Sequence, residues 1–155
     1  MSAVLHRLTL PDAEATAALA GLIAPRLAAG DTLLLEGDIG AGKTTFARAL
    51  IRARLGDAGA EVPSPTFTLV QVYDADGVEI WHCDLYRLSD SQEVLELGLD
   101  EAFRTAICLV EWPDRLGPDV PPGALTCRFA AGPDAHRLDL QGDADWRARL
   151  GDLHV

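Results

Sequence analysis

The sequence predicts an α/β fold with a mostly parallel central sheet, helices on its faces and antiparallel hairpins at its edges. Segments with strand character alternate with segments of helical periodicity, which is the pattern of α/β layers. Residues 32–35 and 107–110 are short continuous apolar runs, typical of strands buried on both faces of a parallel sheet. Two further pairs of segments flank hairpin turn signals and predict antiparallel edge strands. A length of 155 residues fits one domain, so we expect a single domain over residues 1–155.

The first half of the chain predicts a strand, a helix, a buried strand and a second helix. Residues 5–10 have strand character, and Asp12 then begins a helix whose apolar residues recur at helical spacing. Pro25 interrupts that spacing, so we expect the helix to kink or end there. After the buried strand at 32–35, helical periodicity returns and continues to a glycine stop at Gly56. The apolar face of this second helix consists of Phe46, Ala47, Leu50, Ile51 and Leu55.

Two hairpins are predicted beyond the second helix. Residues 66–73 are rich in β-branched and aromatic side chains, and the turn signal Asp76-Gly77 follows them. Residues 78–85 should therefore pair antiparallel with them. Near the C-terminus, 125–129 and 136–140 form the second predicted hairpin, around Gly132-Pro133.

Two short helices complete the predicted elements. Ser89 and Gln92 have the spacing of a capping box before a helix that Gly98 ends. Residues 113–123 are rich in proline and glycine, which predicts a loop. Asp143 is positioned to cap a last short helix.

The chain is acidic, with 24 Asp and Glu against 13 Lys and Arg and a net charge of −11. Contact with nucleic-acid phosphates requires clustered basic residues, so this balance argues against direct binding of nucleic acid. Twelve of the basic residues are arginines, and Lys43 is the single lysine. The position of that lysine decides much of the functional interpretation.

Cysteine content and hydropathy predict a soluble cytoplasmic protein that does not enter a membrane. The N-terminus has no apolar stretch of signal-peptide length, and no apolar run approaches the roughly 18 residues that span a bilayer. The three cysteines, Cys83, Cys108 and Cys127, are odd in number and widely spaced, which fits neither a disulfide framework nor a zinc site. We therefore expect three reduced thiols.

Residues 37–44 match the phosphate-binding pattern G-x-x-x-x-G-K-[ST], between the predicted buried strand and the second helix. Glycines allow backbone N–H groups to converge on phosphate oxygens, and the helix start adds a partial positive charge. Lys43 supplies a cation for the β- and γ-phosphates, and the Thr44 hydroxyl is placed to bind Mg²⁺. The expected nucleotide-binding residues are Gly37, Asp38, Ile39, Gly40, Ala41, Gly42, Lys43, Thr44 and Thr45. The motif and its flanks predict a three-layer P-loop NTPase fold.

The same lysine favours ATP over GTP as the nucleotide. Guanine recognition in P-loop GTPases uses an N/T-K-x-D motif, and the only lysine of this chain already lies in the phosphate loop. Asp84 and Glu111 follow predicted strands, and the carboxyl ends of such strands converge on the ligand crevice. Either carboxylate could therefore reach Mg²⁺ or the attacking water. Each also has a simpler interpretation as a solvated strand end.

Three further residues near these motifs have open interpretations. Thr66 follows Pro63-Ser64-Pro65, where a switch-like loop could sense the γ-phosphate, although a simple turn explains the prolines equally well. Arg87 could offer charge to the γ-phosphate or form a surface ion pair. His82 is interpreted as a packed strand histidine in preference to a catalytic one.

Five sequence blocks resemble, in order and spacing, the bacterial tRNA threonylcarbamoyladenosine biosynthesis ATPase family, TsaE (formerly YjeE). The resemblance covers about residues 10–113. The blocks are GDIGAGKTTF (37–46), SPTFTLV (64–70), HCDLYRL (82–88), EVLELGL (93–99) and CLVEWP (108–113). The resemblance implies a Mg²⁺-dependent P-loop ATPase of low intrinsic activity. It also implies two partner proteins, TsaB and TsaD, which install the threonylcarbamoyl group on tRNA adenosine 37 (t6A). The tRNA would then be reached only through these partners.

The resemblance also implies roles for individual residues. Lys43 and Thr44 would bind phosphate and Mg²⁺, with Glu111 in the Walker-B place as the second metal ligand. Asp84 matches the essential aspartate of the family and is the candidate for orienting the attacking water. The catalytic set is thus Asp84, Lys43 and Glu111. The remaining matches are Thr66 in the switch-like loop, Trp112 at the pocket rim and, weakly, Arg137 near the nucleotide.

Two alternatives remain open from the sequence. A small-molecule kinase could use the same loop, although such kinases usually carry an arginine-rich lid and the arginines here are scattered. A nucleotide-sensing module would bind ATP without productive hydrolysis. The residues that hold adenine have no sharp motif and are expected in the N-terminal segment and the C-terminal hairpin.

Overall fold

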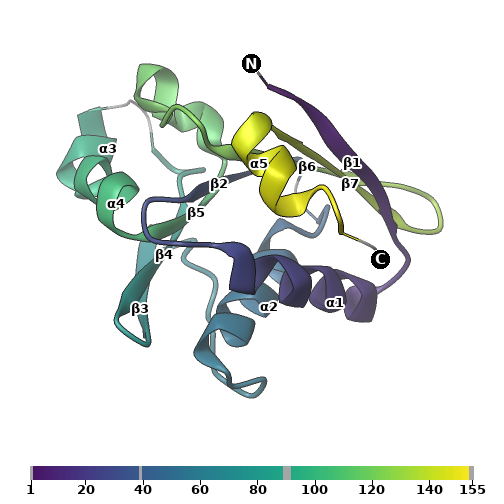
Figure 1. Cartoon of the computed structure of the whole chain (residues 1–155). Coiled ribbons are helices and arrows are strands. Elements are labelled where there is room, and N and C mark those ends of the chain that lie inside the picture. Colours follow the sequence, from purple (N-terminus) through teal and green to yellow (C-terminus); the bar gives the residue numbers. More distant parts are fainter. Residues whose placement is uncertain (1, 39, 89–91, 154–155) are drawn as a thin grey trace.

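A twisted sheet forms the centre of the fold in the computed structural model, which describes residues 2–38, 40–88 and 92–153 (Figure 1). The strands are β1 (Ala3–Leu10), β2 (Thr32–Glu36), β3 (Val70–Ala75), β4 (Val78–Asp84), β5 (Ile107–Glu111), β6 (Leu125–Ala131) and β7 (His136–Gly142). In the described residues these seven strands form one sheet in the order β1-β7-β6-β2-β5-β4-β3.

The sheet is mostly parallel, as predicted. Parallel ladders join β2 to β5, β2 to β6 and β4 to β5, while β1–β7, β6–β7 and β3–β4 are antiparallel. Because β1 and β6 both run opposite to β7, five of the seven described strands share one direction. The other two, β3 and β7, are members of the two predicted hairpins.

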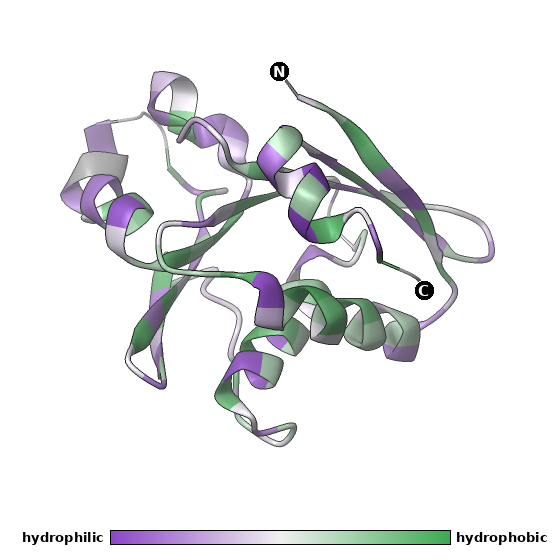
Figure 2. Ribbon diagram, viewed as in Figure 1, coloured by the Kyte–Doolittle hydropathy of each residue, from purple (hydrophilic) through white to green (hydrophobic). Residues whose placement is uncertain are grey.

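Helices cover both faces of the sheet. They are α1 (Ala13–Ile23), η1 (Ala24–Arg26), α2 (Lys43–Leu55), α3 (Gln92–Glu96), α4 (Leu99–Thr105), η2 (Pro113–Asp119) and α5 (Ala144–Leu150). Buried residues of α1, α2 and α5 pack on one face, and those of α4 and η2 pack on the other. In β2, Leu33 and Leu35 contact the first group whereas Leu34 contacts the second. Hydrophobic residues follow the central strands and α1 in Figure 2. The three-layer α/β fold is confirmed.

Several local predictions are confirmed. The Asp12 side chain caps α1 by accepting a bond of 2.8 Å from the backbone N–H of Ala15, and Pro25 lies in the short η1 turn that follows. Gly56 ends α2 with a φ of +67°. Asp76 and Gly77 have φ values of +57° and +88°, and such positive angles at both central residues make the tight hairpin turn that twists with the strands.

The predicted strand at 66–73 is wrong in its first half. Residues 66–69 form a turn, and β3 begins at Val70. Leu69 has a φ of +69°, and its N–H donates to the carbonyl of Pro65 at 2.7 Å. A left-handed residue cannot continue a regular strand, so the turn overrides the β-propensity of Thr66 and Thr68.

Two other segments differ from the prediction. Residues 99–105 form α4, and the expected loop contains η2, because proline and glycine are compatible with short 3₁₀ turns. Gly98 has a φ of +83° and lies between α3 and α4. Ser89, the predicted cap of α3, lies outside the described residues.

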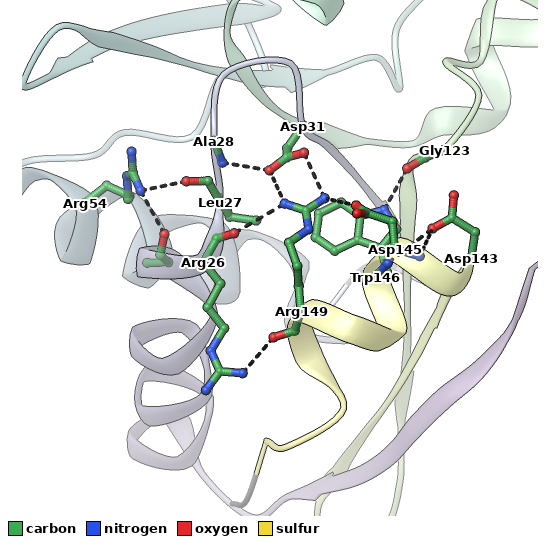
Figure 3. Close-up of polar contacts among 11 residues, drawn as sticks. Arg26, Leu27, Ala28, Asp31, Arg54, Gly123, Asp143, Asp145, Trp146 and Arg149 are labelled. Atoms are coloured by element: carbon green, nitrogen blue, oxygen red, sulfur yellow. Dashed lines mark hydrogen bonds and ion pairs between the residues drawn. The ribbon is translucent and has the colours of Figure 1, made fainter.

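The C-terminal helix α5 is attached to the sheet by polar contacts (Figure 3). Asp143 caps it by accepting from the N–H groups of Asp145 and Trp146, at 3.1 and 3.2 Å. The buried indole of Trp146 donates to the carbonyl of Gly123 at 2.7 Å. Arg149 binds both carboxylate oxygens of Asp31, at 2.6 and 3.1 Å, and its guanidinium lies 3.8 Å from the Trp146 ring centroid.

The three cysteines are buried and unpaired. Burial raises the pKa of all three thiols, that of Cys108 to about 12. In the described residues, no helix has both the length and the apolar character needed to cross a bilayer.

Candidate active site

The glycine-rich loop between β2 and α2 has a backbone that only glycine adopts readily. Gly37 and Gly42 have φ values of +137° and +107°. A Cβ on Gly37 would lie 2.4 Å from the carbonyl oxygen of Phe129, so no other residue fits there without a shift. Ala41 is buried, whereas Ile39 lies outside the described residues. The loop leads directly into the N-terminus of α2, where unpaired backbone N–H groups and the partial positive charge of the helix favour binding of an anion.

Lys43, the first residue of α2, is held over the loop. Only 5% of the residue is exposed; its Nζ donates to the carbonyl of Gly37 and lies 3.5 Å from the centroid of the Trp112 ring. Burial lowers the pKa of the Lys43 ammonium, against the opposing attraction of Glu111 and Asp84. Among the described residues, no carboxylate forms an ion pair with this ammonium. The ammonium is thus held mainly by a carbonyl and an aromatic face.

Glu111 is the more buried of the two carboxylates, Asp84 and Glu111, that line the cleft. It ends β5 and is 2% exposed. Its Oε1 accepts a hydrogen bond of 2.8 Å from the Thr44 hydroxyl, and its Oε2 lies 2.7 Å from Nε2 of His82. Both carboxylate oxygens are therefore engaged by side chains from two different elements, α2 and β4.

Asp84 lies beside Glu111 because β4 and β5 are parallel neighbours with these two residues in register. Its Oδ2 accepts from the Thr66 hydroxyl at 3.3 Å, and its Oδ1 accepts from the backbone N–H of Tyr86 at 3.1 Å. Thr66 is also 2.8 Å from the Ser64 hydroxyl. The turn at 66–69 thus places Thr66 against a carboxylate of the cleft.

These residues surround one cleft of about 430 Å³. It is lined by Gly40, Gly42, Lys43, Thr44, Thr45, Thr66, Asp84, Tyr86, Glu111, Trp112 and His136. A second hollow of about 310 Å³ shares Gly42, Thr45 and His136 with it. This second hollow continues between the start of α1 and the β6–β7 turn, the two regions in which the adenine contacts were expected.

Some predicted residues lie elsewhere. Arg87 lies 5.4 Å from the ring centroid of Phe67, whose side chain is exposed, and does not line the cleft. Arg137 lies in β7 in register with Thr9 and lines neither hollow. Asp38 lines a different hollow, which shares Trp112 with the cleft.

Two lining residues were not singled out from the sequence. Tyr86 packs on Trp112 with ring centroids 4.8 Å apart, and its position two residues after Asp84 is the signal that could have found it. His136 comes from the far end of the chain, and only the β6–β7 hairpin brings it to Gly42. No local pattern marks His136.

The comparisons with known proteins agree on one family. The model of "Threonylcarbamoyl adenosine biosynthesis protein TsaE" matches residues 10–138. The tRNA threonylcarbamoyladenosine biosynthesis protein TsaE of Rickettsia conorii is 44% identical over 106 residues, which are 68% of this chain and 60% of that protein. The Bacillus subtilis protein of the same name is 43% identical over 109 residues, 70% of this chain and 66% of that protein.

A solved structure extends this similarity to the whole fold. The crystal structure of Bacillus subtilis YdiB matches with a TM-score of 0.78 and 30% identity, covering 97% of this chain and 93% of that one. The aligned part of the chain spans about three fifths of the length of the first Rickettsia relatives. The family model and these relatives together show that the chain belongs to the TsaE family.

Proposed function

We propose that this chain binds and hydrolyses ATP in support of the threonylcarbamoyl modification of tRNA adenosine 37. The supporting observation is that one cleft brings the loop residues Lys43 and Thr44 together with Asp84 and Glu111. The pathway is inferred from the family, since its relatives are described as tRNA threonylcarbamoyladenosine biosynthesis proteins. TsaB and TsaD homologues are the proposed protein partners, and tRNA is reached only through them. Such a role implies a cytoplasmic location.

The two adjoining hollows support a bound nucleotide. The phosphates would lie against the glycine-rich loop and the start of α2, where Lys43 exchanges its bond to the Gly37 carbonyl for phosphate oxygens. The base would occupy the smaller hollow between the start of α1 and the β6–β7 turn, next to His136. Its walls include the apolar side chains of Leu10, Pro11 and Pro133, which suit a flat aromatic base.

The residues present fit a magnesium ion. Thr44, Glu111 and Asp84 offer only oxygen atoms, which Mg²⁺ prefers. Among the described residues, no group of three or more His, Cys, Asp or Glu side chains could hold a metal by itself. Mg²⁺ is usually bound by one or two protein ligands together with substrate phosphates, so Thr44 and Glu111 would hold it jointly with the nucleotide. Bound there, it would neutralise charge on the β- and γ-phosphates.

Asp84 is the proposed residue that orients the attacking water. Each of its oxygens accepts one hydrogen bond, from Thr66 and from the Tyr86 N–H, and these bonds fix the carboxylate at the cleft wall. A fixed carboxylate retains lone pairs that can accept a hydrogen bond from a water molecule. Low intrinsic activity and dependence on partner proteins are the expected behaviour for this family.

Two substitutions separate binding from hydrolysis. Lys43→Ala removes the cation of the loop, so we expect loss of ATP binding measured by isothermal titration calorimetry. Asp84→Asn keeps the shape of the side chain, so we expect ATP to bind while phosphate release falls by at least about 100-fold, as for loss of a positioned proton acceptor. Arg104→Ala, an exposed substitution on α4, serves as the control.

The outcomes distinguish the alternatives. Unchanged ATP binding by Lys43→Ala would contradict the proposal, because no other lysine or arginine lines the cleft in the described residues. Undiminished cellular function of Asp84→Asn together with loss of function by Lys43→Ala would favour a nucleotide-sensing module. ATP-dependent phosphorylation of a sugar or nucleoside would favour the kinase.

A further inference from the structure

A fully buried histidine lies directly behind Glu111. His82 on β4 is 0% exposed, and its Nε2 is 2.7 Å from Oε2 of Glu111. It does not line either hollow of the proposed nucleotide site. The hydrogen bond of its ring among the described residues is with the Glu111 carboxylate, which does line the cleft.

The contact with Glu111 is the basis for assigning the ring hydrogen of His82. An ionised carboxylate only accepts hydrogen bonds, so we assign the hydrogen to Nε2, which donates to Glu111. The other ring nitrogen, Nδ1, is buried and has no hydrogen-bond partner among the described residues. A buried polar atom without a partner is unfavourable, and an apolar side chain would avoid that cost. The bond to Glu111 is thus the one polar interaction of the buried ring in the described structure.

The opposite oxygen of Glu111 faces the phosphate loop. Its Oε1 accepts from the Thr44 hydroxyl at 2.8 Å, while Oε2 accepts from His82. Alternation along the parallel β4–β5 ladder puts His82 and Glu111 on the same face of the sheet, the face covered by α2. Donors from β4 and α2 therefore hold the carboxylate from two sides and fix its rotation.

We propose that His82 is a positioning residue for the divalent cation that accompanies the nucleotide. By holding Oε2, it keeps Oε1 of Glu111 beside the Thr44 hydroxyl, so that the two oxygens are presented together. The inference rests on the proposed nucleotide site and adds to it a residue that touches neither metal nor nucleotide. Partners of this kind orient metal-binding carboxylates and typically contribute about 10- to 100-fold to metal affinity or activity.

Three variants test the proposal. His82→Leu removes the donor and keeps an apolar buried side chain. His82→Gln places an amide N–H₂ at nearly the distance of Nε2 and preserves the bond. His82→Asn has the same chemistry but a shorter reach. Correct folding of each variant is checked by its thermal unfolding midpoint.

The readout is ADP affinity measured by titration calorimetry, once with Mg²⁺ and once with EDTA, which does not depend on ATP turnover. In His82→Leu and His82→Asn, we expect the ratio of ADP affinity with Mg²⁺ to ADP affinity in EDTA to fall about 10- to 100-fold. The ADP affinity in EDTA should stay at the wild-type value. His82→Gln should regain most of the Mg²⁺ effect. If His82→Leu does not fold, the difference in the Mg²⁺ effect between His82→Gln and His82→Asn tests the proposal.

Two results would overturn the inference. The first is an unchanged Mg²⁺ effect in both His82→Leu and His82→Asn. The second is an equal loss of ADP affinity with and without Mg²⁺, which would indicate a purely structural role. Failure of the wild-type chain to bind ADP under either condition would instead contradict the proposed function itself.

Discussion

The carboxylate of Glu111 is where side chains from three sequence blocks meet. Thr44 of the phosphate loop and His82 of the HCDLYRL block each contact one of its oxygens, and Asp84 of the same block lies beside it. Lys43 lies close enough for Glu111 and Asp84 to raise its pKa, although burial has the larger effect and lowers it. The site therefore places the single ammonium of this acidic chain near two carboxylates.

Gly37 is the position where a single added methyl group should matter most. Its φ of +137° is unfavourable for any other residue, and a Cβ would lie 2.4 Å from the Phe129 carbonyl. We expect Gly37→Ala to lower the free energy of unfolding by about 1–3 kcal/mol and to abolish ATP binding. Chemical denaturation and titration calorimetry measure these two effects.

Gly21 provides the matched control for that substitution. It lies within α1, where an added Cβ meets open space, so Gly21→Ala should raise the free energy of unfolding by about 0.5–1 kcal/mol. Equal stabilities of the two variants would show that the loop tolerates a side chain at Gly37.

At the scale of elements, the C-terminal helix α5 shows how a short segment becomes fixed. Seven residues cannot form a stable isolated helix, so tertiary contacts must hold α5 in place. The tertiary contacts are the bond from the Trp146 indole to Gly123 and the two hydrogen bonds from Arg149 to Asp31, and the Asp143 cap adds a local contact (Figure 3). The partly buried carboxylate of Asp31 joins the start of β2 to the helix.

Arg149→Ala should therefore destabilise the protein. It removes the two charge-assisted bonds to Asp31, an ion pair with Asp145 and a bond to the Arg26 carbonyl. Among the described residues, Asp31 then keeps the backbone N–H of Ala28 as its donor. We expect a loss of about 1–3 kcal/mol in the free energy of unfolding, measured by chemical denaturation. Arg147→Ala, an exposed neighbour on the same helix, should change stability by less than about 0.5 kcal/mol. An equal effect of the two variants would contradict the assigned contacts.

The elements that the sequence predicted well are those with strong local signals. The apolar runs in β2 and β5, the Asp12 cap and the Asp76-Gly77 turn all have a local physical cause. The turn at 66–69 was missed because its residue types favour strands, whereas hydrogen bonds of Thr66 and Leu69 with the distant residue Asp84 hold the backbone in a turn. The lining of the cleft follows the same rule. The motif residues Lys43, Thr44, Asp84 and Glu111 line it, whereas no local pattern marks His136, because only the sheet order brings it there.

At the scale of the whole molecule, sheet order assembles the cleft. Parallel neighbours β2, β5 and β4 end at one edge, which places the phosphate loop, Glu111 and Asp84 together. The β6–β7 hairpin closes the side of the cleft with His136. A net charge of −11 is compatible with a tRNA-modification role if partner proteins make the tRNA contacts.

We propose that ATP use in this cleft supports t6A formation. The most direct measurement is the t6A content of tRNA, by mass spectrometry of nucleosides, from cells in which the Lys43→Ala variant is the only copy. The proposed function predicts that t6A falls well below the wild-type amount, while Arg147→Ala cells retain it. Wild-type t6A content in the Lys43→Ala cells, with the variant protein present at normal abundance, would contradict it.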